Sequence, residues 1–278
     1  MTEAAQGPDA QVPTARADDG PGMTLDDVVA HLDALLRTRE VPDYGGAVNG
    51  LQVANSGRVK RVACAVDFSR AAVDGAVAAG ATLLVVHHGM FWGGAQPMVG
   101  PAYERVRRVF AADLAVYSSH LPLDTHPELG NNVLMARELG LEPSAGFARY
   151  KTVDVGVSGE ADVETAELAA RARAFAARWG HALVHTPIAP GRRTRRWGLC
   201  TGAGASSDTL AEASARGIDT LVVGEGPHHT GVEAAERGVA VLYAGHYATE
   251  TLGVRALGAE LERAFGLAWS FVGEPTGV

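Results

Sequence analysis

Three short groups of histidine and carboxylate residues in the sequence could bind metal ions. The groups are His87 with His88, His120 with Asp124, and His246 with Glu250. Neutral imidazoles and carboxylates are typical ligands of zinc, manganese and iron, and not of a calcium or magnesium cage. Two or three histidines with two carboxylates suffice for two metal ions about 3.5–4 Å apart, which can activate water at neutral pH. These residues therefore predict a dinuclear metal centre with hydrolytic chemistry.

Each of the three groups follows an apolar run that predicts a buried strand. These runs cover 83–86, 115–118 and 239–244. Side chains just beyond the carboxyl ends of buried strands form the usual ligand site of open α/β sheets. Adjacent residues of a strand point to opposite faces, but a twist at the strand end lets His87 and His88 converge. The alternative for such a pair is one core histidine and one solvated histidine.

The second half of the chain repeats the order of elements in the first half. A strand at 61–67, a helix ending at Gly80, and strands at 81–87 and 114–120 have counterparts later in the chain. The counterparts are 196–202, a helix ending at Gly217, 219–225 and 239–246. A duplicated α/β unit explains this order, with two half-sites facing each other.

The predicted fold class is therefore α/β, with two similar halves, mostly parallel sheets and a metal site between the halves. The predicted divisions are a disordered tail at 1–22, a first half at 23–145, a connecting segment at 146–196 and a second half at 197–278. Thr24 is expected to cap a helix over 25–38, and a long helix is expected over 162–179.

Composition excludes several classes of function. The 278 residues carry a formal net charge of −8, which argues against general nucleic-acid binding. No window of 18 apolar residues predicts a membrane span, and no secretory signal is expected at the start. Cys64 and Cys200 lie inside apolar runs, so we expect buried thiols in a reducing compartment and a cytoplasmic location.

Two further segments leave alternatives open. The arginines between Arg192 and Arg196 are either a solvated turn or a rim that binds an anionic substrate. The glycine-rich segment 202–207 resembles a phosphate-binding loop only loosely. No nucleophile elbow or P-loop is present in the sequence.

The motifs together resemble one known family, the hexameric dinuclear-metal proteins called type 2 GTP cyclohydrolase I, which are NGG-interacting-factor-like. The motifs are Asn49-Gly50-Leu51-Gln52-Val53, His87-His88-Gly89, Ser119-His120 with Asp124, Gly130-Asn131-Asn132, Thr201-Gly202-Ala203-Gly204 and Gly245-His246-Tyr247-Ala248-Thr249-Glu250. The resemblance covers about residues 23 to 275. This chain departs from the family's pattern at Leu121-Pro122-Leu123 and lacks the central insertion of longer members.

The resemblance implies a metal ligand set. His88 and Asp124 would bind one divalent ion, His87 and His246 the other, and Glu250 would bridge them. His120 would serve as a general acid or base, with His228 and His229 in the same pocket. The ions would be zinc, manganese or iron, and six copies would form a toroidal homohexamer with the sites facing its interior.

The resemblance also implies a reaction, the hydrolytic opening of a purine ring at C8 with loss of formate. We therefore predict a metal-dependent hydrolase of a small nucleotide-like molecule. The alternative is a metal-binding regulatory or scaffold ring protein without catalysis. Fold alone does not choose between them.

Overall fold

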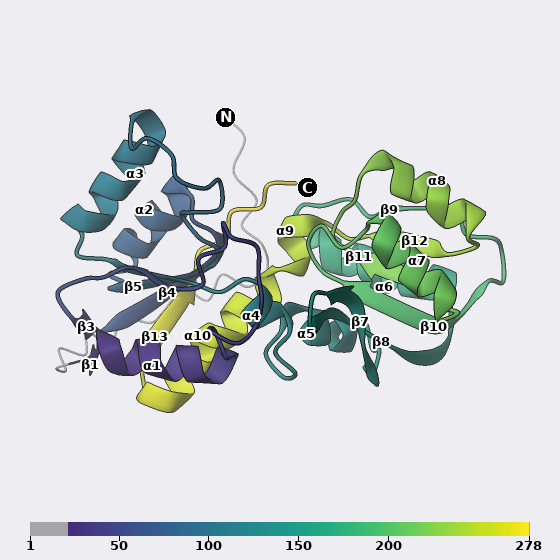
Figure 1. Cartoon of the computed structure of the whole chain (residues 1–278), viewed down its shortest axis with the longest axis horizontal. Helices are drawn as coiled ribbons and strands as arrows, with labels where there is room; N and C mark the ends of the chain where they lie inside the picture. Colours follow the sequence, from purple (N-terminus) through teal and green to yellow (C-terminus); the bar gives the residue numbers. More distant parts are fainter. Residues whose placement is uncertain (1–21, 278) are drawn as a thin grey trace. The chain divides into compact units, whose positions relative to one another are not determined.

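The computed structural model describes residues 22–277, and these form two compact units (Figure 1). Unit 1 contains the described residues up to Leu123 together with Gly253–Glu274. Unit 2 contains Asp124–Leu252 and Pro275 to residue 277. The predicted tail at 1–22 lies outside the described residues except for Gly22.

Unit 1 is built on a five-stranded sheet with the strand order β13-β4-β5-β6-β2. Strands β13, β4, β5 and β6 run parallel, and β2 pairs antiparallel with β6. The strands and helices of this unit are β1 (Met23–Thr24), α1 (Leu25–Leu36), β2 (Gly50–Val53), β3 (Arg58–Val59), β4 (Arg61–Asp67), α2 (Arg70–Ala78), β5 (Leu83–His88), α3 (Gly100–Ala111), β6 (Ala115–Ser118) and β13 (Ala268–Phe271). Helix α4 (Leu121–Asp124) leads out of the unit, and α10 (Thr251–Phe265) leads back into it.

Helices cover both faces of this sheet, with α2 and α3 on one side and α1 and α10 on the other (Figure 1). Alternate residues of β4 therefore enter different cores. Ala63 and Ala65 pack with the apolar side chains of α2. On the opposite face, a Cβ atom on Gly258 of α10 would lie 3.0 Å from Cys64 Sγ. Burial on both faces explains why β4 and β5 are almost continuously apolar.

Unit 2 is built on a six-stranded mixed sheet with the order β7-β8-β10-β11-β12-β9. Its strands β10, β11 and β12 run parallel, and β9 pairs antiparallel with β12. The elements of this unit are α5 (Asn131–Glu138), β7 (Ala145–Tyr150), β8 (Val153–Glu164), α6 (Thr165–Ala177), β9 (Val184–His185), β10 (Arg193–Cys200), α7 (Ser207–Ala215), β11 (Thr220–Val223), α8 (His228–Glu236), β12 (Ala240–Tyr243) and α9 (His246–Thr249). Helices α5 and α6 share one apolar core with the sheet, and α7 and α8 share another.

The predicted α/β class with two sheet-bearing halves is confirmed. Strands β4, β5 and β6 in unit 1 and β10, β11 and β12 in unit 2 have the same parallel order and an antiparallel neighbour beside the third strand. The helix after each third strand joins the other unit, because α5 packs in unit 2 and most of α10 in unit 1. The two compact units therefore have different bounds from the two repeats that the sequence suggests. The predicted divisions at residues 145 and 196 stay predictions.

Local signals of the sequence account for the helix ends. The Thr24 hydroxyl accepts a hydrogen bond from the Asp27 backbone N–H at 3.1 Å, so α1 begins where the cap was predicted. Ser69 and Ser206 cap α2 and α7 in the same way. Among residues 22–277 no helix has the length and apolar character needed to cross a membrane.

Candidate metal centre

His87 and His88 are the last two residues of β5, and their side chains converge. The ring centroids lie 4.7 Å apart, so the two imidazoles converge as expected from the sequence. His87 is fully buried and His88 partly buried. The strand pairs with β4 and β6 on either side, so its backbone is held along its whole length. This pairing makes the two imidazoles rigid neighbours.

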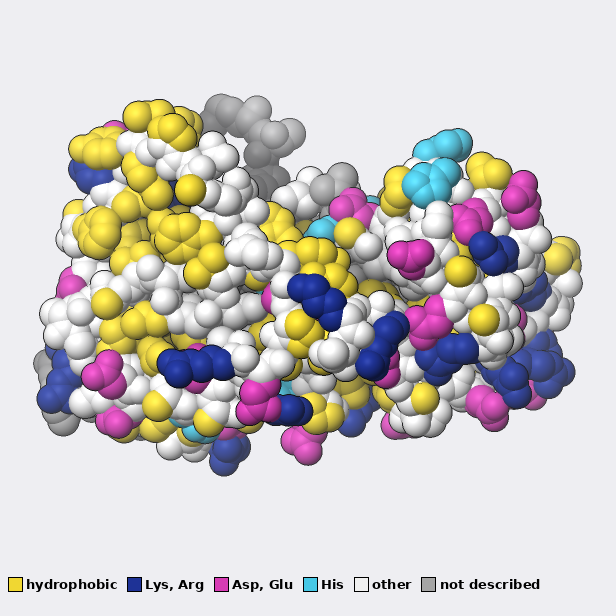
Figure 2. All heavy atoms as spheres, in the orientation of Figure 1, with side chains coloured by type: hydrophobic (Ala, Val, Ile, Leu, Met, Phe, Trp, Pro, Cys, Tyr) yellow, Lys and Arg dark blue, Asp and Glu magenta, His cyan; other side chains and the backbone are white. Residues whose placement is uncertain are grey.

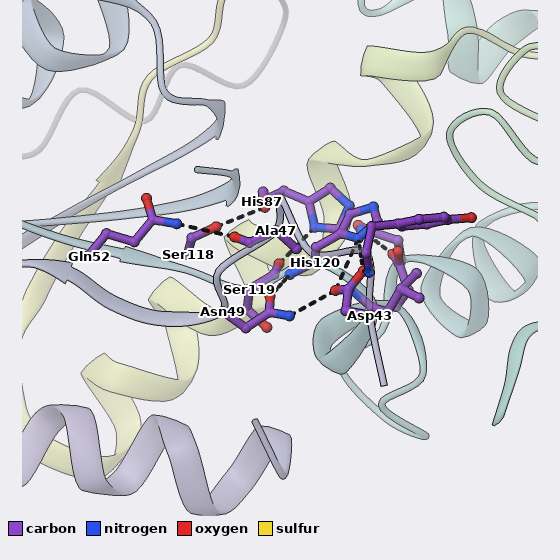
Figure 3. A network of polar contacts seen from close by, with 12 residues as sticks. Asp43, Ala47, Asn49, Gln52, His87, Ser118, Ser119 and His120 are labelled. Atoms are coloured by element: carbon purple, nitrogen blue, oxygen red, sulfur yellow. Dashed lines mark hydrogen bonds and ion pairs between the residues drawn. The ribbon is translucent and has the colours of Figure 1, made fainter. Parts of the chain in front are cut away.

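His120 joins this pair from the loop after β6. Its ring centroid lies 4.9 Å from that of His87 and 5.6 Å from that of His88. One nitrogen from each of the three rings lies within 4.8 Å of the others, a spacing that a single metal ion can satisfy. We call His87, His88 and His120 the histidine cluster of unit 1. Figure 3 shows His87 and His120 of this cluster together with Asp43.

In each ring of the histidine cluster, the Nδ1 atom forms a hydrogen bond to a carbonyl or carboxylate oxygen, which accepts the bond. His87 Nδ1 lies 2.8 Å from the Ser119 carbonyl oxygen. His88 Nδ1 lies 2.9 Å from Asp67 Oδ1, and His120 Nδ1 lies 2.9 Å from Asp43 Oδ1. Each Nδ1 therefore carries the proton, and the lone pair of a neutral ring is left on Nε2. This carboxylate–histidine or carbonyl–histidine pairing is the usual outer support of a metal ligand.

Asp43 is the organising carboxylate of the cluster. Its side chain is 7% exposed, and it accepts hydrogen bonds from His120, the Asn49 amide and the backbone N–H groups of Tyr44 and Leu121. Burial raises the pKa of Asp43, but its hydrogen bonds and the charge of His120 outweigh burial and leave the pKa below its usual value. Asp43 is therefore ionised at neutral pH and fixes the orientation of His120.

Unit 2 holds the remaining predicted ligands, of which Asp124 ends α4. Its Oδ1 accepts a hydrogen bond from Asn131 Nδ2 at 2.9 Å. The neighbouring Asn132 amide donates to the Val155 carbonyl, and its oxygen accepts from the Thr201 N–H. The two asparagines of the Gly130-Asn131-Asn132 motif thus tie Asp124 to β8 and to the end of β10.

His246 and Glu250 lie one helical turn apart across α9, and they contact each other. His246 Nε2 lies 3.1 Å from Glu250 Oε2, and His246 Nδ1 lies 2.8 Å from Glu225 Oε1. Burial lowers the pKa of His246, but the bonds to the two glutamates outweigh burial and raise the pKa to about 9. In the metal-free protein a proton supplies the positive charge that these carboxylates favour, and a divalent ion could supply it instead.

Gly202 leaves room for this pair. A Cβ atom at this position would lie 2.1 Å from Glu250 Oε1, and its backbone has a φ of +61°, in the left-handed region. Glycine adopts this conformation without a steric penalty. The glycine after β10 is therefore explained by the close approach of Glu250.

The structure brings together His87, His88 and His120 in unit 1, and His246 with Glu250 in unit 2. Asp124 belongs to neither set and is held by Asn131. The structure also shows supports that the sequence did not indicate. Asp43 and Asp67 were missed as supports. Asp67 pairs in register with His88, so its place at the exit of β4 was a usable signal. Asp43 carries no such signal, because it lies in an irregular loop 77 residues from His120.

Other residues singled out in the sequence belong to unit 2. His228 and His229 are exposed at the start of α8. Arg193 pairs with Asp162, and Arg192 donates to the carbonyl oxygens of Asp219 and Gly238. Arg193 thus links β10 to β8, and Arg192 holds the turns before β11 and β12. Arg193 to Arg196 belong to strand β10, so the segment is a surface strand and not the predicted turn.

Neither cysteine has the character of a nucleophile. Cys64 and Cys200 are buried, and burial raises the pKa of each thiol to about 12. The negative charges of Asp124 and Glu250 contribute to the shift at Cys200. A thiol is unreactive at such a pKa, because the thiolate is the reactive form.

The fold and these histidines define an α/β protein with a candidate metal centre, and sequence comparison identifies its family. A profile described as Duf34/NIF3 (NGG1p interacting factor 3) matches residues 23–274, so the chain belongs to this family. A Deinococcus radiodurans protein named GTP cyclohydrolase 1 type 2 homolog is 41% identical, covering 91% of this chain and 94% of its own. A Halobacterium salinarum protein of the same name is also 41% identical, covering 92% and 100%.

Solved structures show the same fold. The structure described as protein ybgI, of unknown function, superposes with a TM-score of 0.83 at 32% identity and covers 92% of this chain and 100% of its own. A protein from Thermus thermophilus superposes with a TM-score of 0.76 at 36% identity, with the same coverage. The likeness extends over nearly all the described residues.

Proposed function

We propose that this protein is a metal-dependent hydrolase of a small nucleotide-like molecule, with two divalent metal ions per chain. The observation that carries the proposal is the hydrogen bonding that the four histidines His87, His88, His120 and His246 have in common. An accepting oxygen lies at the Nδ1 atom of each ring, which is the support that histidines binding a metal through Nε2 almost always have. The three rings of unit 1 also lie within reach of one ion, and His246 Nε2 contacts the Glu250 carboxylate.

The proposed ligand set follows the sequence prediction. His88 and Asp124 hold one ion, His87 and His246 hold the other, and Glu250 bridges the two. The donor set is nitrogen and carboxylate oxygen, which fits zinc, manganese or iron. When bound, such a pair of ions lowers the pKa of water and polarises the substrate.

His120 is the proposed general acid or base. Its Nδ1 proton is held by the ionised Asp43, so the ring can accept a proton at Nε2 and later donate it from there. The same pairing would also suit a third imidazole ligand, because all three rings of the cluster are close together. Metal content of a His120→Gln variant separates the two roles.

The names of the relatives suggest a substrate. Proteins named GTP cyclohydrolase 1 type 2 homolog cover this chain almost completely, so GTP is the first substrate to assay. Ring opening at purine C8 needs an activated water and a proton for the leaving nitrogen, which are the roles proposed above. A protein that binds metal but hydrolyses no nucleotide would favour the regulatory or scaffold alternative.

We also propose the homohexamer that the family resemblance implies. Apolar side chains gather on the surface of unit 1 around α3 (Figure 2). Val99 and Phe110 are 68% and 66% exposed there, and Tyr103 is half-exposed. Contact with another copy would bury such side chains favourably. Light scattering on the purified protein tests the assembly.

Elemental analysis of zinc-reconstituted protein tests the metal centre. We expect about two metal ions per chain in the wild type and fewer in His87→Ala, His88→Ala and Glu250→Gln. His229→Ala is the matched control, because His229 is exposed at the start of α8 and is not one of the proposed ligands. A wild type without bound zinc, manganese or iron would refute the proposal, and equal metal content in Glu250→Gln would refute the bridging role.

A further inference from the structure

Two loops beside the histidine cluster of unit 1 each carry an exposed aromatic side chain. Tyr44 lies before β2 and is 53% exposed, and Trp92 follows β5 and is 43% exposed. Their ring centroids lie 6.3 Å apart, with the ring planes at 76°. Two large aromatic rings thus stand nearly at right angles to each other and are open to solvent.

Both rings adjoin the histidines to which we assign chemistry. The Trp92 ring centroid lies 4.5 Å from that of His120 and 5.4 Å from that of His88. The Tyr44 ring centroid lies 6.1 Å from that of His120. A molecule that contacted either aromatic ring would therefore lie beside the cluster.

Gln52 joins the two loops. Its Nε2 donates to the carbonyl oxygens of Ala47 and Val48, and its Oε1 accepts from the Met90 N–H at 2.8 Å. The loop backbones also pack directly, since a Cβ atom on Gly46 would lie 2.6 Å from the Trp92 carbonyl oxygen. The rings are therefore positioned before any ligand binds, which reduces the entropic cost of binding.

We infer that Tyr44 and Trp92 form a stacking site for the planar heterocyclic ring of the substrate, with the chemistry of a nucleobase. The inference rests on the proposed function and names the part of the substrate that these residues hold. Aromatic rings at right angles let a planar ligand stack on one face and meet the edge of the other. Base–aromatic stacking is a common source of nucleotide affinity.

The chemistry of the two rings favours a heterocycle over a phosphate as the group that they hold. An aromatic face stacks on a planar ring, whereas a phosphate is bound by cationic side chains and N–H donors. The phosphate part of a nucleotide would therefore lie away from the two ring faces.

The other explanation is that the rings only cover the histidines and exclude water. An aliphatic side chain of similar bulk would serve as a cover, but stacking requires an aromatic ring. Replacement by leucine and replacement by phenylalanine therefore separate the two roles. Phe265→Leu is the matched control, because Phe265 is a half-buried aromatic residue at the end of α10. It precedes the start of β13 and so lies at the end of the sheet opposite the cluster.

Calorimetric titration of the zinc-reconstituted protein with guanosine monophosphate and with ribose 5-phosphate tests the inference. The second probe has the same sugar and phosphate but no base. We expect the wild type to bind guanosine monophosphate more tightly, and Trp92→Leu and Tyr44→Leu each to weaken that binding on the order of 10-fold. Trp92→Phe, Tyr44→Phe and Phe265→Leu should keep it within about 3-fold, since each leaves two aromatic rings at the proposed site.

The outcomes separate this inference from the proposed function. Leucine variants that bind guanosine monophosphate as the wild type does, or a wild type that binds both probes equally, would overturn the stacking site. Zinc content is measured on the same samples and should not change in the leucine variants. A wild type without zinc would refute the metal centre, while ring-dependent binding in that same sample would still support the stacking site.

Discussion

Replacement of Asp43 by asparagine is the sharpest test of how the histidine cluster is built. The carboxylate is 7% exposed, so solvent cannot replace its partners. Four donors share the two oxygens of the Asp43 carboxylate. In the asparagine variant one of these oxygens becomes an NH₂ group, which cannot accept a hydrogen bond from the donors that face it. These donors are the Tyr44 N–H, Asn49 Nδ2, His120 Nδ1 and the Leu121 N–H.

Two of the four hydrogen bonds are then lost. A buried donor without a partner costs about 1–3 kcal/mol, so Asp43→Asn should lower the free energy of unfolding by about 2–6 kcal/mol. Asp67→Asn is the matched control, because Asp67 also holds a histidine but is 42% exposed. We expect that control to lose less than about 1 kcal/mol.

Urea unfolding of the metal-free variants, followed by tryptophan fluorescence and circular dichroism, measures both losses. The urea midpoints can be compared only if the m value, the dependence of the unfolding free energy on urea concentration, is the same in all variants. A changed m value would mean that the substitution altered the compactness of the unfolded or the native state. A loss below about 1 kcal/mol in Asp43→Asn, or an equal loss in Asp67→Asn, would refute the burial and bond count on which the reasoning depends.

The same carboxylate should make stability depend on acid. The pKa of Asp43 is lower in the folded protein than in the unfolded chain. Its contribution to the free energy of unfolding is therefore complete above the unfolded pKa of about 4. It is lost as the pH falls through the lower folded pKa. The difference in stability between wild type and Asp43→Asn should therefore shrink below about pH 4, and a constant difference would contradict this assignment.

Three further predictions concern the metal ligands and the proposed acid or base. In metal-free protein the pKa of His246 is raised to about 9, so the protonated ring stabilises the folded state. This contribution is complete below the unfolded pKa of about 6.5 and is lost as the pH rises towards 9. Thermal melting at a series of pH values measures this loss, and His246→Ala should abolish it. Gly202→Ala forces a left-handed alanine against Glu250, so it should cost about 1–3 kcal/mol and lower the metal content, which melting and elemental analysis measure. His120→Gln should keep both metal ions and lose about 10²–10⁴-fold in turnover, and loss of metal instead would make His120 a ligand.

The sequence by itself predicted the elements that position the candidate site. Continuous apolar runs indicated β4, β5 and β6, because strands buried on both faces lack alternation. The hydroxyl cap at Thr24 and the glycine at Gly80 predicted where helices begin and end, and the structure confirms them. These signals are local, so a sequence contains them in full.

The tertiary structure decided which distant residues support the predicted ligands. Asp43 contacts His120 across 77 positions, and Glu225 contacts His246 across 21. No periodicity encodes such pairs, because they depend on how separate loops pack over the strand ends. The exchange of α5 and α10 between the compact units was hidden for the same reason, since an amphipathic helix can cover any apolar sheet face that its connection can reach.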